Sequence, residues 1–135
     1  MYLMPSEKKK IVVMEPDVRA MRELEIMLAP HFTVTGTFQV DRTLAALRAD
    51  RDVKAVVIGA AKGTDVLSTL AAIRSEFPSV LRILLTGFED LSMVVEGLHS
   101  GMVQRVLSKP LQFAELLGML RSGDLPGFGA TALAS

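Results

Sequence analysis

The chain has 135 residues, half of them hydrophobic, with fifteen basic and fifteen acidic residues and no cysteine. This length suits one domain with a real core. The balanced charge argues against binding to nucleic acid or an anionic membrane, and the lack of cysteine excludes disulfides, thiolate metal sites and thiol nucleophiles. No apolar stretch reaches the roughly 20 residues of a membrane span and the start lacks the pattern of a signal peptide, so we expect a cytoplasmic protein.

Five apolar runs along the chain predict β-strands. In order, they are residues 10–14, 32–38, 54–59, 81–87 and 104–108. The first, third and fourth are nearly continuous in Val, Ile and Leu, which is typical of parallel strands covered on both faces. The second and fifth are more mixed, so we place them at the edges of the sheet.

Apolar residues recur at helical spacing after each predicted strand. We expect Pro16 in the first turn of the first helix, Asp41 as the N-cap of the second, and helix ends before Pro78 and at Gly101. We interpret each apolar stripe as core. The five stripes are Val18, Met21, Leu24 and Leu28; Leu44 and Leu47; Val66, Leu70, Ile73 and Phe77; Leu91, Val94, Val95 and Leu98; and Phe113, Leu116, Leu117 and Leu120.

This alternation predicts an α/β fold, a doubly wound (βα)5 flavodoxin-like sandwich with a parallel five-stranded sheet of order 2-1-3-4-5. We assign residues 1–8 to a flexible N-terminal segment, 9–121 to the domain, and 122–135, rich in Gly, Ala and Pro, to a tail or the start of a linker. Ligands of such folds bind beyond the carboxyl ends of the strands, which directs attention to residues 13–17, 59–63, 86–90 and 108–110.

Three segments at these positions carry a resemblance. They read EPDVR (residues 15–19), ILLTGFED (83–90) and SGMVQRVLSKP (100–110). In order and spacing across the (βα)5 pattern, residues 9–121 resemble a bacterial response-regulator receiver domain. The resemblance implies phosphoryl transfer to an aspartate at the end of the third strand, with Mg²⁺ held by that aspartate and by an acidic pair after the first strand.

Some of the family's parts are present in this sequence. Thr86 resembles the hydroxyl residue that senses the phosphoryl group, and Lys109 resembles the lysine that pairs with it. The aromatic switch position of the fifth strand is Val106, so we expect the coupled Thr–aromatic rearrangement to be lost. The resemblance also predicts a cis peptide bond between Lys109 and Pro110.

The reactive parts are missing. Val13 and Met14 stand where the acidic pair belongs, and Gly59 stands at the phosphoacceptor position, which leaves Glu15 as the nearest carboxylate of the first segment. We therefore predict loss of phosphorylation and of Mg²⁺ binding, with no cofactor. An unpaired buried ammonium is costly, so we expect Lys109 either to pair with Glu15 or to reach solvent.

The resulting hypothesis is a pseudo-receiver, a signalling module of the two-component type that acts by protein–protein interaction and is not an enzyme. Its partner is expected to be a protein of a histidine-kinase pathway or an output domain, with a homodimer through the fourth helix, fifth strand and fifth helix as a further arrangement. The residues expected on that outward side are Met93, Gly97, Val106, Gly118 and Met119.

Two alternatives remain open. One is a receiver phosphorylated at a non-standard carboxylate, Asp65 or Glu15, although N-capping of the third helix explains Asp65 as well. The other is a sensor of a small anionic ligand in the vacated pocket. The residues expected to line that pocket are Val13, Met14, Gly59, Thr86 and Lys109. His31 and His99 lack the spacing of metal ligands, so we predict no metal site from them.

Overall fold

The computed structural model describes residues 8–61, 63–109 and 112–121. Five parallel strands form one sheet in the order β2-β1-β3-β4-β5, as the sequence predicts. The strands are β1 (Lys10–Met14), β2 (Thr33–Thr37), β3 (Val53–Gly59), β4 (Leu81–Thr86) and β5 (Arg105–Ser108). The apolar strands β1, β3 and β4 are the three inner ones and are buried almost throughout. The predicted doubly wound (βα)5 fold is therefore confirmed.

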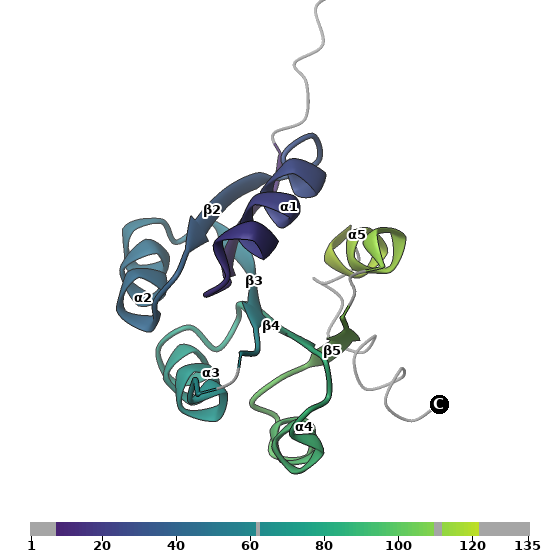
Figure 1. The fold of residues 1–135 in the computed structure, drawn as a ribbon. Helices are drawn as coiled ribbons and strands as arrows, with labels where there is room; N and C mark the ends of the chain where they lie inside the picture. The colour runs from purple at the N-terminus through teal and green to yellow at the C-terminus, as the bar shows by residue number, and fades with distance from the viewer. Residues whose placement is uncertain (1–7, 62, 110–111, 122–135) are drawn as a thin grey trace, which may run out of the picture.

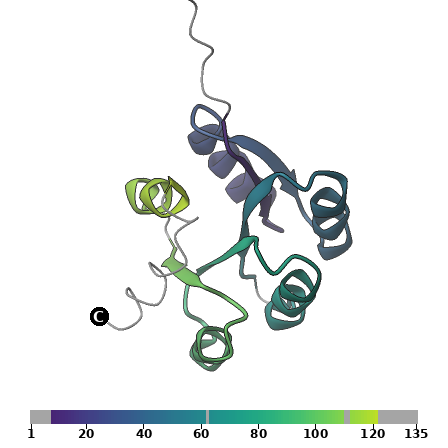
Figure 2. The ribbon, with the colours of Figure 1, turned by 180° about the vertical axis from the view of Figure 1, so that it is seen from behind.

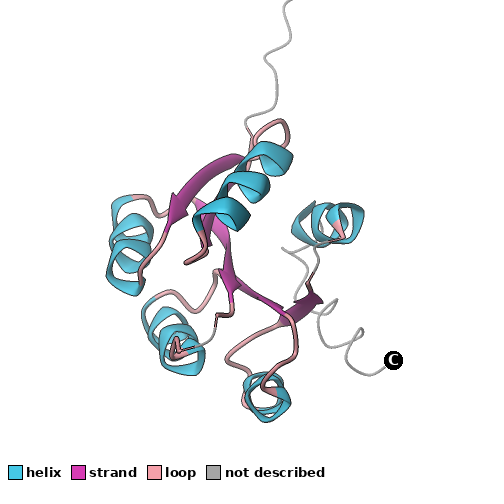
Figure 3. Ribbon diagram, viewed as in Figure 1, coloured by secondary structure: helices cyan, strands magenta, loops and turns pink. Residues whose placement is uncertain are grey.

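The helices cover both faces of this sheet. They are α1 (Val18–Leu28), α2 (Val40–Ala49), α3 (Val66–Glu76), α4 (Leu91–His99) and α5 (Phe113–Arg121). Figures 1 and 2 show α1 and α5 on one face and α2, α3 and α4 on the other. Figure 3 shows the succession of strand, loop and helix along the described residues. No helix among the described residues has the length and apolarity to cross a bilayer.

Each face of the sheet has its own aliphatic core. Val12, Met14 and Ile58 point to the side of α2, α3 and α4, whereas Val13 and Val57 point to the side of α1 and α5. This alternation follows from the period of two along a strand. Neighbouring residues of one strand therefore lie in different cores.

The start of α1 differs from the expectation. Pro16 lies outside the helix, and Asp17 is the N-cap, with its carboxylate accepting a hydrogen bond from the backbone N–H of Arg19 at 2.9 Å. Asp has the short oxygen side chain that a helix start requires, and Pro does not. Val18, expected in the core, is 64% exposed because it precedes the buried stripe of the helix.

The start of α2 differs from the expectation too, since this helix begins earlier than we expected. Gln39, not Asp41, is the N-cap, and Asp41 lies in the first turn. The Thr43 hydroxyl is within 2.6 Å of the Thr37 hydroxyl and donates to the carbonyl of Gln39 at 2.8 Å, which ties the helix start to the end of β2. An acidic residue in the first turn still favours the helix through its dipole.

Three expectations fall outside the described residues. They concern residues 1–7 of the N-terminal segment, the 122–135 tail, and the isomer of the peptide bond that joins Lys109 to residue 110. Lys8 is described, and its ammonium group donates to the carbonyl of Ala29 at 3.1 Å.

Candidate functional site

A cleft of about 660 Å³ opens at the carboxyl ends of β1, β3 and β4. Its walls come from the segments that follow these strands, together with the start of α4 and the residue after β5. We call it the Glu15 cleft. Its lining residues are Glu15, Asp17, Ala60, Ala61, Gly63, Thr64, Val66, Thr86, Glu89, Asp90, Met93 and Lys109. The cleft lies where a doubly wound sheet places its ligands.

Glu15 follows the last residue of β1 and is only 1% exposed. Its backbone N–H donates to the carbonyl of Thr37 at 3.0 Å, which continues the pairing of β1 with β2. Its Oε2 accepts a hydrogen bond from the backbone N–H of Asp17 at 3.0 Å. Its Oε1 is buried with no hydrogen-bond partner among the described residues. The backbone around Glu15 thus directs this carboxylate inward.

The inward-pointing carboxylate lies against Gly59, the last residue of β3. A Cβ atom at position 59 would overlap Glu15 Oε1 and would lie 2.8 Å from Glu15 Cδ, closer than real Cβ contacts come. The Glu15 carboxylate therefore fills the space that a side chain at position 59 would need. Within the pocket that we expect to be vacated, the place beside Gly59 is thus occupied by the carboxylate of Glu15, which follows the neighbouring strand.

Lys109 faces the same carboxylate from the end of β5. Its ammonium group donates to the carbonyl of Ala60 at 2.8 Å and lies 3.7 Å from Glu15 Oε1. The Lys109 side chain is 34% exposed, and its backbone N–H donates to the carbonyl of Thr86 at 2.8 Å. The ammonium is therefore both paired with Glu15 and in contact with solvent, which combines the two arrangements that we expected as alternatives.

Thr86 lies at the end of β4 and is 1% exposed. Its hydroxyl oxygen accepts a hydrogen bond from the backbone N–H of Phe88 at 3.0 Å. Phe88 has a φ of 64°, which is uncommon for a bulky residue. The Thr86 hydroxyl thus stabilises an unusual turn between β4 and α4.

Val13 and Met14, which we expected to line the pocket, do not line the Glu15 cleft. Both lie inside β1 and are at most 2% exposed, Val13 in the core beneath α1 and α5 and Met14 in the core on the other face. The strand ends one residue before the cleft, so Glu15 is the first residue of this segment that reaches it.

The described lining of the Glu15 cleft contains four acidic residues and one basic residue. Asp17 and Asp90 use their carboxylates to cap α1 and α4, where each accepts from a backbone N–H. The described residues contain no group of three or more His, Cys, Asp or Glu arranged to hold a metal ion. This charge distribution does not suit the small anion of our alternative hypothesis.

Asp65, the other candidate acceptor, is the N-cap of α3, as expected. Its carboxylate accepts from the backbone N–H of Ser68 at 3.0 Å. Asp65 is not among the residues that line the Glu15 cleft. The structure therefore does not bring Asp65 together with Thr86 and Lys109.

Most residues expected on the interaction surface are less accessible than predicted. Met93, Val106 and Met119 are half-buried and pack against the two cores, and only Gly118 is exposed. Gly97 is buried, and a Cβ atom at this position would lie only 3.2 Å from the Val103 side chain.

The apolar surface near α4 consists of other residues, which sequence reasoning placed in the core or overlooked. Phe88, Leu91 and Val95 are 42%, 61% and 56% exposed. Leu91 and Val95 are four residues apart and lie on the same side of α4, and Phe88 lies in the turn before this helix. The apolar stripe of α4 is wider than a buried helix face needs, and this width is the sequence signal that could have revealed Leu91 and Val95. We call these three residues the α4 stripe.

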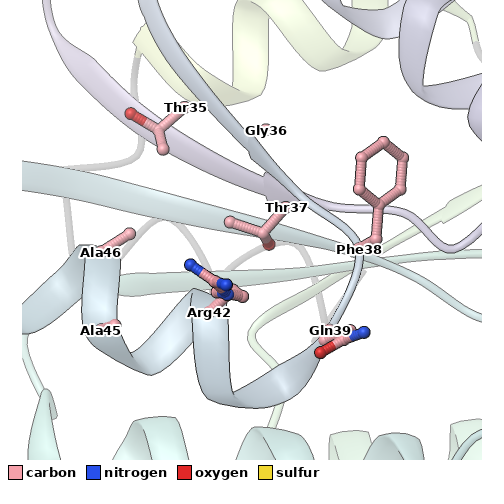
Figure 4. A pocket seen from close by; sticks show the side chains of 8 residues that line it. All are labelled: Thr35, Gly36, Thr37, Phe38, Gln39, Arg42, Ala45 and Ala46. Atoms are coloured by element: carbon pink, nitrogen blue, oxygen red, sulfur yellow. The ribbon is translucent and has the colours of Figure 1, made fainter.

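A further hollow of about 530 Å³ lies beside β2 and the start of α2 (Figure 4). Figure 4 shows Arg42 as the charged side chain of this hollow, among threonine and alanine side chains. The Thr37 hydroxyl is already hydrogen-bonded to Thr43. The described lining provides no carboxylate, so the Glu15 cleft is the better candidate for the family's site.

Comparisons with known proteins agree with the fold. No protein-family model matches the sequence, and no curated protein matches it. The structure is similar to the signal receiver domain of an HD domain-containing protein from Pseudomonas fluorescens Pf-5, with 26% identity and a TM-score of 0.79 over 98% of this chain and 97% of that one.

Two further structures show the same fold at lower identity. A response regulator receiver domain protein from Clostridium thermocellum is 18% identical, with a TM-score of 0.78 over 85% of this chain and 93% of that one. An adenylate cyclase structure from Rhodopirellula baltica is 22% identical, with a TM-score of 0.78 over 87% of each chain. The strand order and these likenesses show that the chain has the fold of response-regulator receiver domains.

Proposed function

We propose that this receiver domain works without phosphorylation, as a protein-interaction module of two-component signalling that is not an enzyme. The observation that carries the proposal is the position of Glu15, whose carboxylate occupies the space of a side chain at position 59 and pairs with Lys109 at 3.7 Å. In the receiver family the corresponding lysine pairs with the phosphoryl group, whereas here Lys109 pairs with a carboxylate of the chain itself.

The described groups around Glu15 are poorly suited to accept a phosphoryl group. Glu15 Oε1 is buried, and Oε2 is engaged by the backbone of Asp17. An attacking oxygen must be accessible in line with the donor, which neither atom achieves in this packing. The Thr86 hydroxyl oxygen already accepts a hydrogen bond from the backbone N–H of Phe88.

The Mg²⁺ ion of the family does not fit this donor set either. A hard cation needs several oxygen ligands, and Glu15 is a single buried carboxylate with an ammonium group 3.7 Å away. Asp17 and Asp90 cap the helix starts, and Glu89, the fourth acidic residue of the cleft, is exposed with its carboxylate against Gly87. We therefore propose that the domain uses no metal and no cofactor.

Receiver domains act by binding proteins such as kinases and output domains. For this chain we propose the α4 stripe as the contact surface, in place of the residues that we expected from the sequence. Phe88, Leu91 and Val95 supply apolar area beside the Glu15 cleft, and exposed apolar groups of this kind mark interaction sites. A partner bound to the α4 stripe would contact the turn that Thr86 stabilises, because Phe88 belongs to both.

A phosphorylation assay tests the proposal. The full chain is incubated with acetyl phosphate and Mg²⁺, and its intact mass is measured beside that of a receiver domain known to autophosphorylate. We expect no added mass on this chain while the control is modified. An added, hydroxylamine-labile phosphate would contradict the proposal, and its loss in Glu15→Gln or Asp65→Asn would identify the non-standard acceptor.

A further inference from the structure

A second cleft, of about 540 Å³, lies at the opposite edge of the sheet from Glu15. Lys9 and Ile11 line it at the start of β1, Lys54 at the start of β3, and Leu81 at the start of β4, so it opens at the amino-terminal ends of the strands. We call it the amino-edge cleft. Its volume is within the range of small-molecule sites in proteins.

The charged residues that line the amino-edge cleft are all basic. They are Lys9, Arg51 and Lys54, and no acidic residue is among the described lining. The chain as a whole has equal numbers of acidic and basic residues, so this is a local segregation of charge. The described lining of the cleft therefore has a net positive charge, which favours an anion over a cation.

Two of these cations are available for a ligand. The ammonium group of Lys54, an exposed residue, has no ion pair or hydrogen bond within the part of the chain that the structure describes. The Arg51 guanidinium lies 5.2 Å from the centre of the Phe77 ring, an arrangement that leaves its N–H groups free to donate. The nearby Glu76 does not neutralise Arg51 fully, because Glu76 accepts two hydrogen bonds from Arg48 at 2.6 and 2.7 Å.

The rest of the lining is apolar, with a few polar groups at one side. Ile11, Phe32 and Leu120 are at most 4% exposed and provide apolar walls. Gln104 Oε1 accepts from the backbone N–H of Arg82 at 2.7 Å, which leaves the amide nitrogen of Gln104 to donate. Ser79 adds a hydroxyl group. Apolar walls with a few placed polar groups are typical of a ligand site.

We infer that the amino-edge cleft binds a small organic anion with a carboxylate or phosphate head and a short apolar body. The cations and the Gln104 amide suit the head, and the walls of Ile11, Phe32 and Leu120 suit the body. An inorganic anion would leave the apolar walls unused. Nucleic acid would need a longer basic track than this one cleft provides. This inference is independent of the proposed function, which concerns the other edge of the sheet.

The test is a titration of the full chain with octanoate, followed by calorimetry and by amide chemical shifts in ¹H–¹⁵N spectra. We expect octanoate to shift amides around Lys54, Ser79 and Gln104 and to leave those around Glu15 and Lys109 unchanged. Acetate has the carboxylate head of octanoate without its apolar body, whereas octan-1-ol and octylammonium have the apolar body without the negative charge. We expect each of these three compounds to bind more weakly than octanoate. Comparison of the affinities of octyl phosphate and octanoate shows whether the cleft prefers a phosphate or a carboxylate head.

A matched pair of variants locates the site. Lys54→Gln removes a cleft cation that has no partner among the described residues, and Arg42→Gln removes a cation from the hollow beside α2. We expect octanoate affinity to fall about tenfold in Lys54→Gln, the size of one hydrogen bond to a charged group, and to be unchanged in Arg42→Gln. Thermal unfolding of both variants checks that the fold is intact. The inference is overturned if octanoate fails to bind, if octylammonium or acetate binds equally well, or if Lys54→Gln binds like the unaltered chain.

Discussion

At the scale of single residues, Glu15 and Gly59 form a matched pair. The glutamate is long enough to place its carboxylate over the end of β3, and the glycine leaves the space for it. The same carboxylate needs Lys109 nearby, since a buried charge without a partner is costly. The glycine at position 59 and the inward-pointing carboxylate of Glu15 therefore depend on each other.

This pairing makes a prediction for Gly59→Ala. The added methyl group would force the Glu15 carboxylate out of its place, away from the backbone N–H of Asp17 and from Lys109, so we expect the free energy of unfolding to fall by about 1–3 kcal/mol. The matched control is Gly118→Ala, where a Cβ meets no atom within 4 Å and removal of a helix glycine is expected to be neutral or stabilising. Denaturant unfolding of both variants measures the difference, and equal stabilities would contradict the predicted collision.

At the scale of elements, Arg82 joins the loops at the amino-terminal edge. It is 4% exposed, and its guanidinium donates to the carbonyls of four residues that flank α3 and α4. These carbonyls belong to Pro78, Val80, Gly101 and Met102, at 2.8–3.3 Å. Burial lowers the pKa of Arg82, and the carbonyl dipoles are what keep its charge tolerable.

We therefore expect Arg82→Met to destabilise the domain by about 3 kcal/mol, because it leaves one buried and three part-buried carbonyls without donors. Arg74→Met is the control. Arg74 is in the same region but makes one exposed hydrogen bond, to the carbonyl of Ser100 at 2.7 Å, so its loss should cost about 1 kcal/mol or less. Chemical denaturation compares the two. A loss in Arg82→Met no larger than in Arg74→Met would show that the buried network contributes little.

The helices α2 and α3 are connected by the ion pair of Arg48 and Glu76. The hydrogen bond from Arg48 lowers the pKa of Glu76 below its usual range. A carboxyl group whose pKa is lowered by folding stabilises the folded state. This contribution is fully present above the pKa of the group in the unfolded chain, about 4.3, and is lost as the pH falls through its pKa in the folded chain. We expect the melting temperature of Glu76→Gln to fall less than that of the unaltered chain on acidification from about pH 7 to pH 3. Glu23→Gln, on exposed α1 surface, should behave like the unaltered chain, and an equally steep fall in Glu76→Gln would refute the contribution.

At the scale of the whole molecule, the hydrophobic pattern determined the fold. The continuous Val, Ile and Leu of β1, β3 and β4 predicted both the parallel sheet and its order, because only doubly covered strands can be apolar throughout. The Thr and Lys-Pro spacing predicted where Thr86 and Lys109 lie. The hydrophobic pattern and the spacing between residues can both be read from the sequence without knowledge of the packing.

The features that the sequence did not predict depend on contacts between distant residues. Nothing in the order of residues shows that the Glu15 carboxylate overlaps the space beside Gly59, which is 44 positions away along the chain. The exposure of Leu91 and Val95 was missed for a related reason. The apolar stripe of α4 is wider than the face that the sheet covers, and only packing decides which of its members stay outside.

The α4 stripe gives a prediction about assembly. We expect Leu91→Glu with Val95→Glu to leave thermal unfolding unchanged, because both side chains are more than half exposed, and to abolish any self-association or partner binding of the domain. Ile26→Glu on α1, with 68% exposure, is the control for added surface charge. Light scattering coupled to size exclusion measures self-association. Complexes that persist in the α4 double variant would place the contact surface elsewhere.

A double-mutant cycle between positions 15 and 59 tests the filled site most directly. Unfolding free energies are measured for the unaltered chain, Gly59→Ala, Glu15→Ala and the double variant. With the Glu15 carboxylate removed, we predict that Gly59→Ala no longer destabilises the domain, which corresponds to a coupling of about 1 kcal/mol or more. Additive effects of the two substitutions would mean that the carboxylate does not occupy the space beside Gly59, and would contradict the account of this site.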